Sequence, residues 1–164
     1  MAIEQTDILY LLSGGAANAA PLASLGGAKS SVPAPLGIFD SMSGAESTAG
    51  SVEFRCVYVH NAHATLPLVG AVLWMSANTP SATTTIEVGI GTAAMNGVEQ
   101  TVGSETSAPS GVSFSPAASL GGGVALGDIP PGQGRSVWFR RTVQANTVAV
   151  NDTFTVMVTG DTAP

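Results

Sequence analysis

The feature that most constrains the fold of this chain is a repeated alternation of apolar and polar side chains with a period of two. It runs through residues 51–61 (SVEFRCVYVHN), 83–90 (TTTIEVGI) and 152–160 (DTFTVMVTG). Side chains two residues apart project from the same face of a β-strand, so each segment predicts a half-buried strand. No long stretch places apolar residues at the i, i+3, i+4 and i+7 spacing of an amphipathic helix. The sequence therefore predicts an all-β protein.

Two further segments are apolar on both faces. They are residues 66–75 (LPLVGAVLWM) and the run Val137, Trp138 and Phe139. A strand of this kind is central in its sheet, or is covered on its second face by another element or chain. Several strands at irregular spacing, separated by turn residues, predict an antiparallel β-sandwich with either an immunoglobulin-like or a jelly-roll-like strand order.

Two long segments lack any periodicity and are rich in Gly, Ala, Ser and Pro. They are residues 13–51 and 92–123. Loops of this length are uncommon inside a compact domain. We predict an extended N-terminal arm and irregular lead-in over residues 1–51, followed by the sandwich over residues 52–164. The sandwich carries a loop-rich insertion at about 92–123.

The chain has few charges, and their balance is acidic. Charged residues make up 10% of the 164 residues, and the formal net charge is −6, whereas soluble domains contain roughly 25% charged residues. Binding to nucleic acid by counterion release needs many Lys and Arg side chains, so the composition argues against a nucleic-acid partner. A surface of small neutral side chains suits packing against other proteins.

The N-terminus and the single cysteine limit the cellular setting. The N-terminus has no basic region, and its apolar run, residues 8–12, is too short for a signal or a membrane span. We expect a protein made in the cytoplasm with no membrane partner. Cys56 is the only cysteine, so no disulfide forms within the chain.

Motifs for chemistry are weak. His60 and His63 form an H-x-x-H pair at the end of a predicted strand, and we interpret them as turn residues rather than metal ligands. Residues 24–31 (SLGGAKSS) resemble a phosphate-binding loop only faintly, because Ala28 interrupts the required glycine–lysine pair. No G-x-S-x-G elbow is present. We predict no catalytic, cofactor or metal site, and no enzyme.

Three of the five basic residues, Arg135, Arg140 and Arg141, gather near Trp138 within residues 127–143 (GDIPPGQGRSVWFRRTV). One interpretation is that the arginines cover an aromatic side chain and pair with scattered acids. The other is a subunit contact, because Trp and Arg are favoured anchors at interfaces. A single-stranded nucleic acid is a minor alternative, since the protein is acidic.

Several sequence blocks together resemble small virion structural proteins of tailed bacteriophages. The first block is DILYLLSGGAANAAPLASLGGAKSS. Later blocks are SGAESTAGSVEFRCVYVHNAHATL, EVGIGTAAMNGVEQTV and IPPGQGRSVWFRRTV. The resemblance implies a head decoration, or cement, protein that binds the major capsid protein on the outer capsid surface as a homotrimer. Such a protein stabilises the capsid lattice against internal DNA pressure.

This resemblance assigns an interface to two groups of residues. The tip of the N-terminal arm would add a strand to a neighbour's sheet edge, and the second group would contact another subunit. The proposed interface comprises Ile8, Leu9, Tyr10, Leu11, Leu12, Trp138, Arg140 and Arg141. Three alternatives remain: a neck or tail component of the same virion, a surface glycan-binding sandwich and a virion-associated hydrolase. A glycan-binding sandwich would have to use Tyr10, Tyr58, Trp74 or Trp138.

Overall fold

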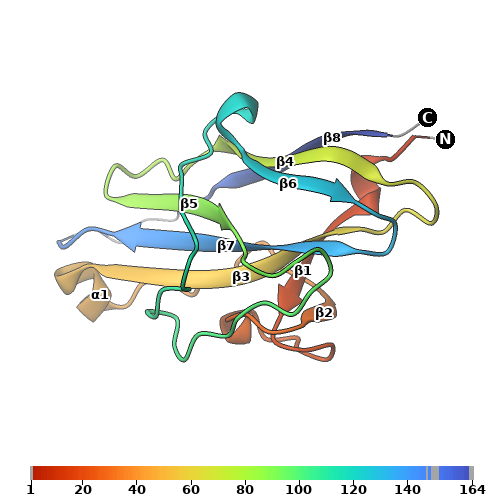
Figure 1. The fold of residues 1–164 in the computed structure, drawn as a ribbon. Helices are drawn as coiled ribbons and strands as arrows, with labels where there is room; N and C mark the ends of the chain where they lie inside the picture. Colours follow the sequence, from red (N-terminus) through yellow and green to blue (C-terminus); the bar gives the residue numbers. More distant parts are fainter. Residues whose placement is uncertain (1, 147, 149–151, 163–164) are drawn as a thin grey trace.

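The computed structural model describes residues 2–146, 148 and 152–162, and these form two packed antiparallel β-sheets (Figure 1). The predicted all-β sandwich is confirmed. Among these residues, one short helix, α1 (Gly44–Ala49), and two single-turn 3₁₀ segments, η2 (Pro21–Ala23) and η3 (Leu120–Gly122), lie between strands. A third 3₁₀ segment, η1 (Gln5–Asp7), precedes the first strand. The strands are β1 (Ile8–Ser13), β2 (Lys29–Pro33), β3 (Ser51–Asn61), β4 (Leu68–Ala77), β5 (Thr84–Ile90), β6 (Val124–Ile129), β7 (Gly134–Val143) and β8 (Thr155–Thr162).

The larger sheet has five strands in the order β2-β1-β3-β7-β5, and the smaller has three in the order β6-β4-β8. The pairing of β3 with β7 is the longest and runs from Ser51 opposite Val143 to His60 opposite Gly134. From β3 to β8, every connection crosses from one sheet to the other. An immunoglobulin sandwich keeps strands D and E in one sheet and strands F and G in the other. The strand order is therefore not that of an immunoglobulin domain.

The main core lies between the two sheets and uses the alternation seen in the sequence. The five-stranded sheet contributes one face of β3, β5 and β7, and the three-stranded sheet contributes the inner face of β4. Core side chains include Val57, Val59, Ile86, Val88, Val137, Phe139, Leu73 and Met75. Strand β4 is the central strand of its sheet, as its apolar sequence predicts.

A second layer of apolar packing covers the other face of the five-stranded sheet. Residues 91–119, which we call the covering loop, run across β5, β7 and β3 (Figure 1). Trp138, Phe54 and Cys56 on the sheet pack with Val102 of the covering loop. The loop lies where the loop-rich insertion was predicted, and its cover explains why β7 is apolar on both faces.

The covering loop approaches the sheet most closely at Gly89 in β5. A Cβ atom at this position would lie 2.5 Å from the carbonyl oxygen of Ser113. Two residues after Ser113, Ser115 forms a β-bridge with Val88. Only glycine leaves room for the loop to reach the sheet at this point.

The free extended arm predicted for residues 1–51 is wrong for its apolar tip. Strand β1 lies inside the larger sheet between β2 and β3, with Ile8 opposite Asn61 and Leu12 opposite Val57. A strand pairing within its own chain does not lose the translational freedom that pairing with another subunit costs. The apolar run therefore completes the sheet of its own molecule.

Candidate functional site

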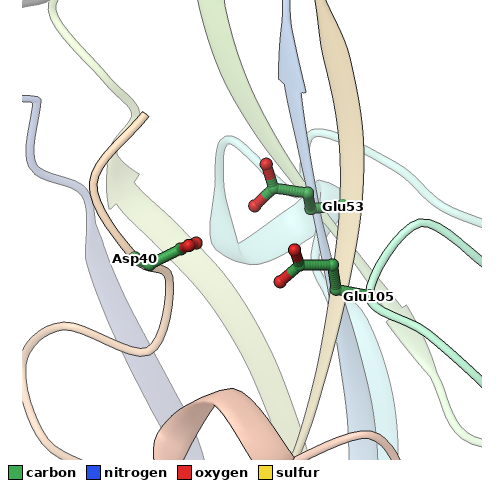
Figure 2. A group of neighbouring side chains, drawn as sticks. All are labelled: Asp40, Glu53 and Glu105. Atoms are coloured by element: carbon green, nitrogen blue, oxygen red, sulfur yellow. The ribbon is translucent and has the colours of Figure 1, made fainter. Parts of the chain in front are cut away.

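Titratable side chains converge at one end of the five-stranded sheet. Figure 2 shows Asp40, Glu53 and Glu105 directed toward a common point. Oxygen atoms of the three carboxylates lie within 4.8 Å of one another, and no other such group of His, Cys, Asp or Glu side chains occurs among the described residues. Asp40 precedes α1, Glu53 belongs to β3 and Glu105 belongs to the covering loop.

Two arginines fill the space between these carboxylates. The Nη2 atom of Arg55 lies 2.5 Å from Glu105 and 3.7 Å from Asp40. The Nη2 atom of Arg141 lies 2.5 Å from Glu53 and 3.4 Å from Asp40. These five side chains form one network, which we call the ionic cluster.

The ionic cluster does not have the properties of a metal centre. A hard cation such as Ca²⁺ needs several free oxygen ligands, but guanidinium groups contact all three carboxylates. The Arg55 side chain is fully buried, and its Nε and Nη1 atoms donate to the carbonyl oxygens of Ile38 and Phe54. A metal ion would have to displace this buried guanidinium from its carboxylate partners. Removing one partner of a buried ion pair costs about 3–5 kcal/mol of folding free energy, which disfavours the exchange. The cluster fastens the segment before α1 and the covering loop to β3 and β7.

Burial and charge act in opposite directions on Glu53. Burial raises the pKa of this carboxyl above its usual range, and the nearby Arg141 guanidinium offsets part of that rise. The side chain of Ser51 also donates a hydrogen bond to Glu53, at 3.1 Å. The Arg141 guanidinium therefore favours the ionised form of Glu53, whereas burial disfavours it.

Arg140 and Arg141 hold irregular segments against opposite faces of the sheet. Arg140 pairs with Glu87 on β5, and its guanidinium carbon lies 4.8 Å from the centre of the Phe114 ring in the covering loop. The guanidinium carbon of Arg141 lies 5.0 Å from the centre of the Phe39 ring. The first interpretation of the arginine group, pairing with acids and covering aromatics, describes both residues.

Trp138 belongs to the core of its own chain. Its relative exposure is 0%, and it packs beneath the covering loop with Phe54, Cys56 and Val102. The prediction that Trp138 contacts another subunit is wrong, because the loop already occupies that face. The indole nitrogen has no hydrogen-bond partner among the described residues.

The five apolar residues predicted to form the tip of the arm belong to β1. Ile8, Leu11 and Leu12 are buried, and Leu9 and Tyr10 are half-buried. The predicted docking role is wrong for the three buried residues, since the sheet and its core surround them. Burial raises the pKa of Tyr10 to about 12.

The ring nitrogens of His60 and His63 have different partners and do not form a common metal site. The Nδ1 atom of His63 accepts the backbone N–H groups of Thr65 and Leu66, at 3.2 and 3.0 Å, which is a turn arrangement. The Nδ1 atom of His60 lies 3.1 Å from the ammonium nitrogen of Lys29. Burial and the Lys29 charge lower the pKa of His60.

The glycine-rich segment 24–31 is packed rather than open to a phosphate. A Cβ atom at Gly26 would lie 1.8 Å from the carbonyl oxygen of Gln100. The neighbouring Gly27 forms a β-bridge with Glu99 of the covering loop. The glycines of this segment let it lie directly against the covering loop.

A groove of about 710 Å³ opens beside the ionic cluster. Its walls come from the segment before α1, from β5 and β7, and from the residues that lead into β8. Sequence reasoning missed the groove and the ionic cluster, because both join segments that are far apart along the chain. No local spacing marks them, although the polar residues Glu53 and Arg55 inside an otherwise apolar strand were a signal for an ion pair.

The chain matches no protein family, no curated protein and no solved structure in the comparisons made. Among the described residues, no helix has the length and apolar character needed to cross a membrane. The structural case for a function therefore rests on the residues of this chain.

Proposed function

We propose that this protein is a head decoration protein that binds the outer surface of a tailed-phage capsid and stabilises its lattice. The observation that carries the proposal is the internal use of its basic residues. Of the five basic residues, Arg55, Arg140 and Arg141 pair with carboxylates of the same chain. The remaining surface is poor in cations and rich in small neutral side chains, which favours contact with protein over contact with DNA.

The packing of the loops also supports a structural role. The ionic cluster and the covering loop fix both long irregular segments against the sandwich. A rigid block loses little conformational entropy when it binds a lattice. Assembly as a homotrimer would multiply weak single contacts with the major capsid protein, without any new chemistry.

The internal position of β1 changes how such a protein would dock. The strand is already paired on both sides, so it cannot be added to a neighbour's sheet. Docking then depends on exposed surface outside β1. Large apolar side chains available there include Leu22, Leu36, Val52, Val98 and Leu120.

The glycan-binding alternative loses most of its aromatic residues in the structure. Tyr58 and Trp138 are buried in the core. Of the other two, Tyr10 lies on β1 in the five-stranded sheet and Trp74 on β4 in the three-stranded sheet. Two aromatics on different sheets do not line one sugar-binding groove, so the decoration role is the better supported proposal.

Immunogold electron microscopy tests the proposal on phage particles whose genome encodes this sequence. Antibodies raised against the recombinant chain should label the outside of the head in a regular pattern. Particles that lack the chain should release their DNA at a lower temperature than complete particles. Labelling at the neck or tail would replace the proposal with the neck or tail alternative, and particles without label would contradict a virion role altogether.

A further inference from the structure

The groove beside the ionic cluster has an apolar interior. Ile38, Phe39, Ile86 and Phe154 are among the residues that line it. Leu36 lies at this groove and is fully exposed, the most exposed of the large apolar side chains among the described residues. An apolar groove next to an exposed leucine is a surface that gains free energy when another apolar side chain covers it.

The lining of the groove has an excess of negative charge. Two carboxylates, Asp40 and Asp152, and one guanidinium group, Arg141, line the groove, so the formal charge of its lining is −1. Asp40 is the most exposed of the three carboxylates of the ionic cluster. Asp152, which also lines the groove, accepts the N–H of Ser81 at 3.2 Å and forms no ion pair with the described residues. A cation that reaches this lining meets Asp152, which has no ion-pair partner among the described residues, and Asp40, which already faces Arg55 and Arg141.

We propose that this groove docks an extended segment of a partner protein that carries a large apolar side chain next to a Lys or Arg. The apolar side chain would enter between Phe39 and Phe154, and the cation would lie over Asp40 and Asp152. Burying one leucine-sized side chain provides the larger part of the affinity. The ion pair fixes the orientation of the segment and speeds its approach.

A second copy of this chain does not match the required segment. Three of its five basic residues are held in internal ion pairs. Lys29 donates to His60, Asn96 and Gly132. Arg135 is half-buried and lies between Gly134 and Ser136, so no large apolar side chain stands next to it in the sequence. A nucleic acid is excluded by the sign of the charge on the groove. A different protein with free basic side chains is the fitting occupant.

This inference deepens the proposed function, because it names the docking face and the chemistry of the capsid segment that would occupy it. It rests on the proposed function only for the identity of the partner. Peptide binding is measured on the isolated full-length chain, so it can succeed even if antibodies fail to label phage heads. Likewise, labelled phage heads would not by themselves show that the groove binds a peptide.

The experiment selects binders from a random peptide library displayed on yeast, with the full-length chain as target. The selected peptides are then synthesised and titrated against four variants by calorimetry. Leu36→Ser and Asp152→Asn alter the groove. Leu120→Ser and Asp161→Asn are matched controls that change an exposed leucine and an exposed aspartate outside its lining.

The selected peptides should share an apolar residue beside Lys or Arg. Leu36→Ser should weaken binding at least about tenfold, because most of the affinity comes from apolar burial. Asp152→Asn should weaken it up to about fivefold, the size of a half-exposed ion pair, and this loss should shrink in high salt. Both controls should bind like the wild type.

Three results would overturn the proposal. One is a selection that yields no peptides, or peptides without basic residues. Another is equal affinity for groove variants and controls. The third is a concentration-dependent dimer in sedimentation that Leu36→Ser abolishes, because this would make a second copy the occupant.

Discussion

Glu99 offers the most direct test of how the covering loop is held. This carboxylate is almost completely buried, with 2% exposure. Its Oε1 atom accepts from the backbone N–H and the hydroxyl of Thr92, at 3.2 and 3.0 Å. Its Oε2 atom accepts from the Ala93 N–H at 3.0 Å and from the Ser136 hydroxyl at 2.6 Å. The last contact joins the covering loop to β7.

The contribution of these hydrogen bonds to the folding free energy follows from the pKa of Glu99. Burial alone would raise it, but the hydrogen bonds from Ser136, Ala93 and Thr92 together outweigh burial and lower the pKa from 4.5 to about 2. This difference corresponds to roughly 3 kcal/mol of folding free energy. Because the folded state favours the ionised carboxylate, this stability is present above pH 4.5 and is lost as the pH falls toward 2.

Glu99→Gln should remove this contribution. The amide nitrogen of a glutamine would face donors rather than acceptors, most directly the N–H of Ala93. We expect the free energy of unfolding at neutral pH to fall by roughly 3 kcal/mol. The acid-dependent loss of stability between pH 4.5 and 2 should also become much smaller.

Urea denaturation at a series of pH values measures both effects, with Asp161→Asn, a change at an exposed carboxyl, as the control. The control should keep the stability and the pH profile of the wild type. The reasoning fails if Glu99→Gln loses as much stability on acidification as the wild type, or if its stability at neutral pH is unchanged.

Four further outcomes test the fold. Trp138→Ala should lower the free energy of unfolding in urea by about 3–5 kcal/mol, since the side chain is fully buried. Gly89→Ala should lower the melting temperature and speed proteolysis of the covering loop, because its Cβ would lie 2.5 Å from the Ser113 oxygen. Deleting residues 1–12 should abolish cooperative unfolding in calorimetry, because it removes an inner strand. Burial raises the pKa of Cys56, so its thiol should react with a disulfide reagent only after unfolding.

The local pattern of the sequence predicted the strands well where one face is buried. The segments 51–61 and 83–90 alternate over most of their length, and β3 and β5 follow them closely. The apolar run Val137 to Phe139 was also interpreted correctly as covered on two faces. What remained open was the identity of the cover, because a buried strand has the same composition whether a loop or another chain lies over it.

The candidate site was less accessible from the sequence. Arg140 and Arg141 stood out by their position, but their partners lie far away along the chain. Arg141 bonds to Asp40 across 101 positions and to Glu53 across 88. Charge pairs of this kind leave no periodic signal, and each arginine had several acids to choose from.

The sequence by itself determined the all-β character of this protein, because the two-residue period of a strand is a local property that neighbouring side chains reveal. It also determined the sparse charge that any partner would meet. Only the tertiary structure decided that β1 completes its own sheet and that the covering loop buries Trp138. It also brought Asp40, Glu53 and Glu105 together around two arginines. These features depend on contacts between distant segments. Burial of apolar surface and the pairing of buried charges favour these contacts over alternative ones.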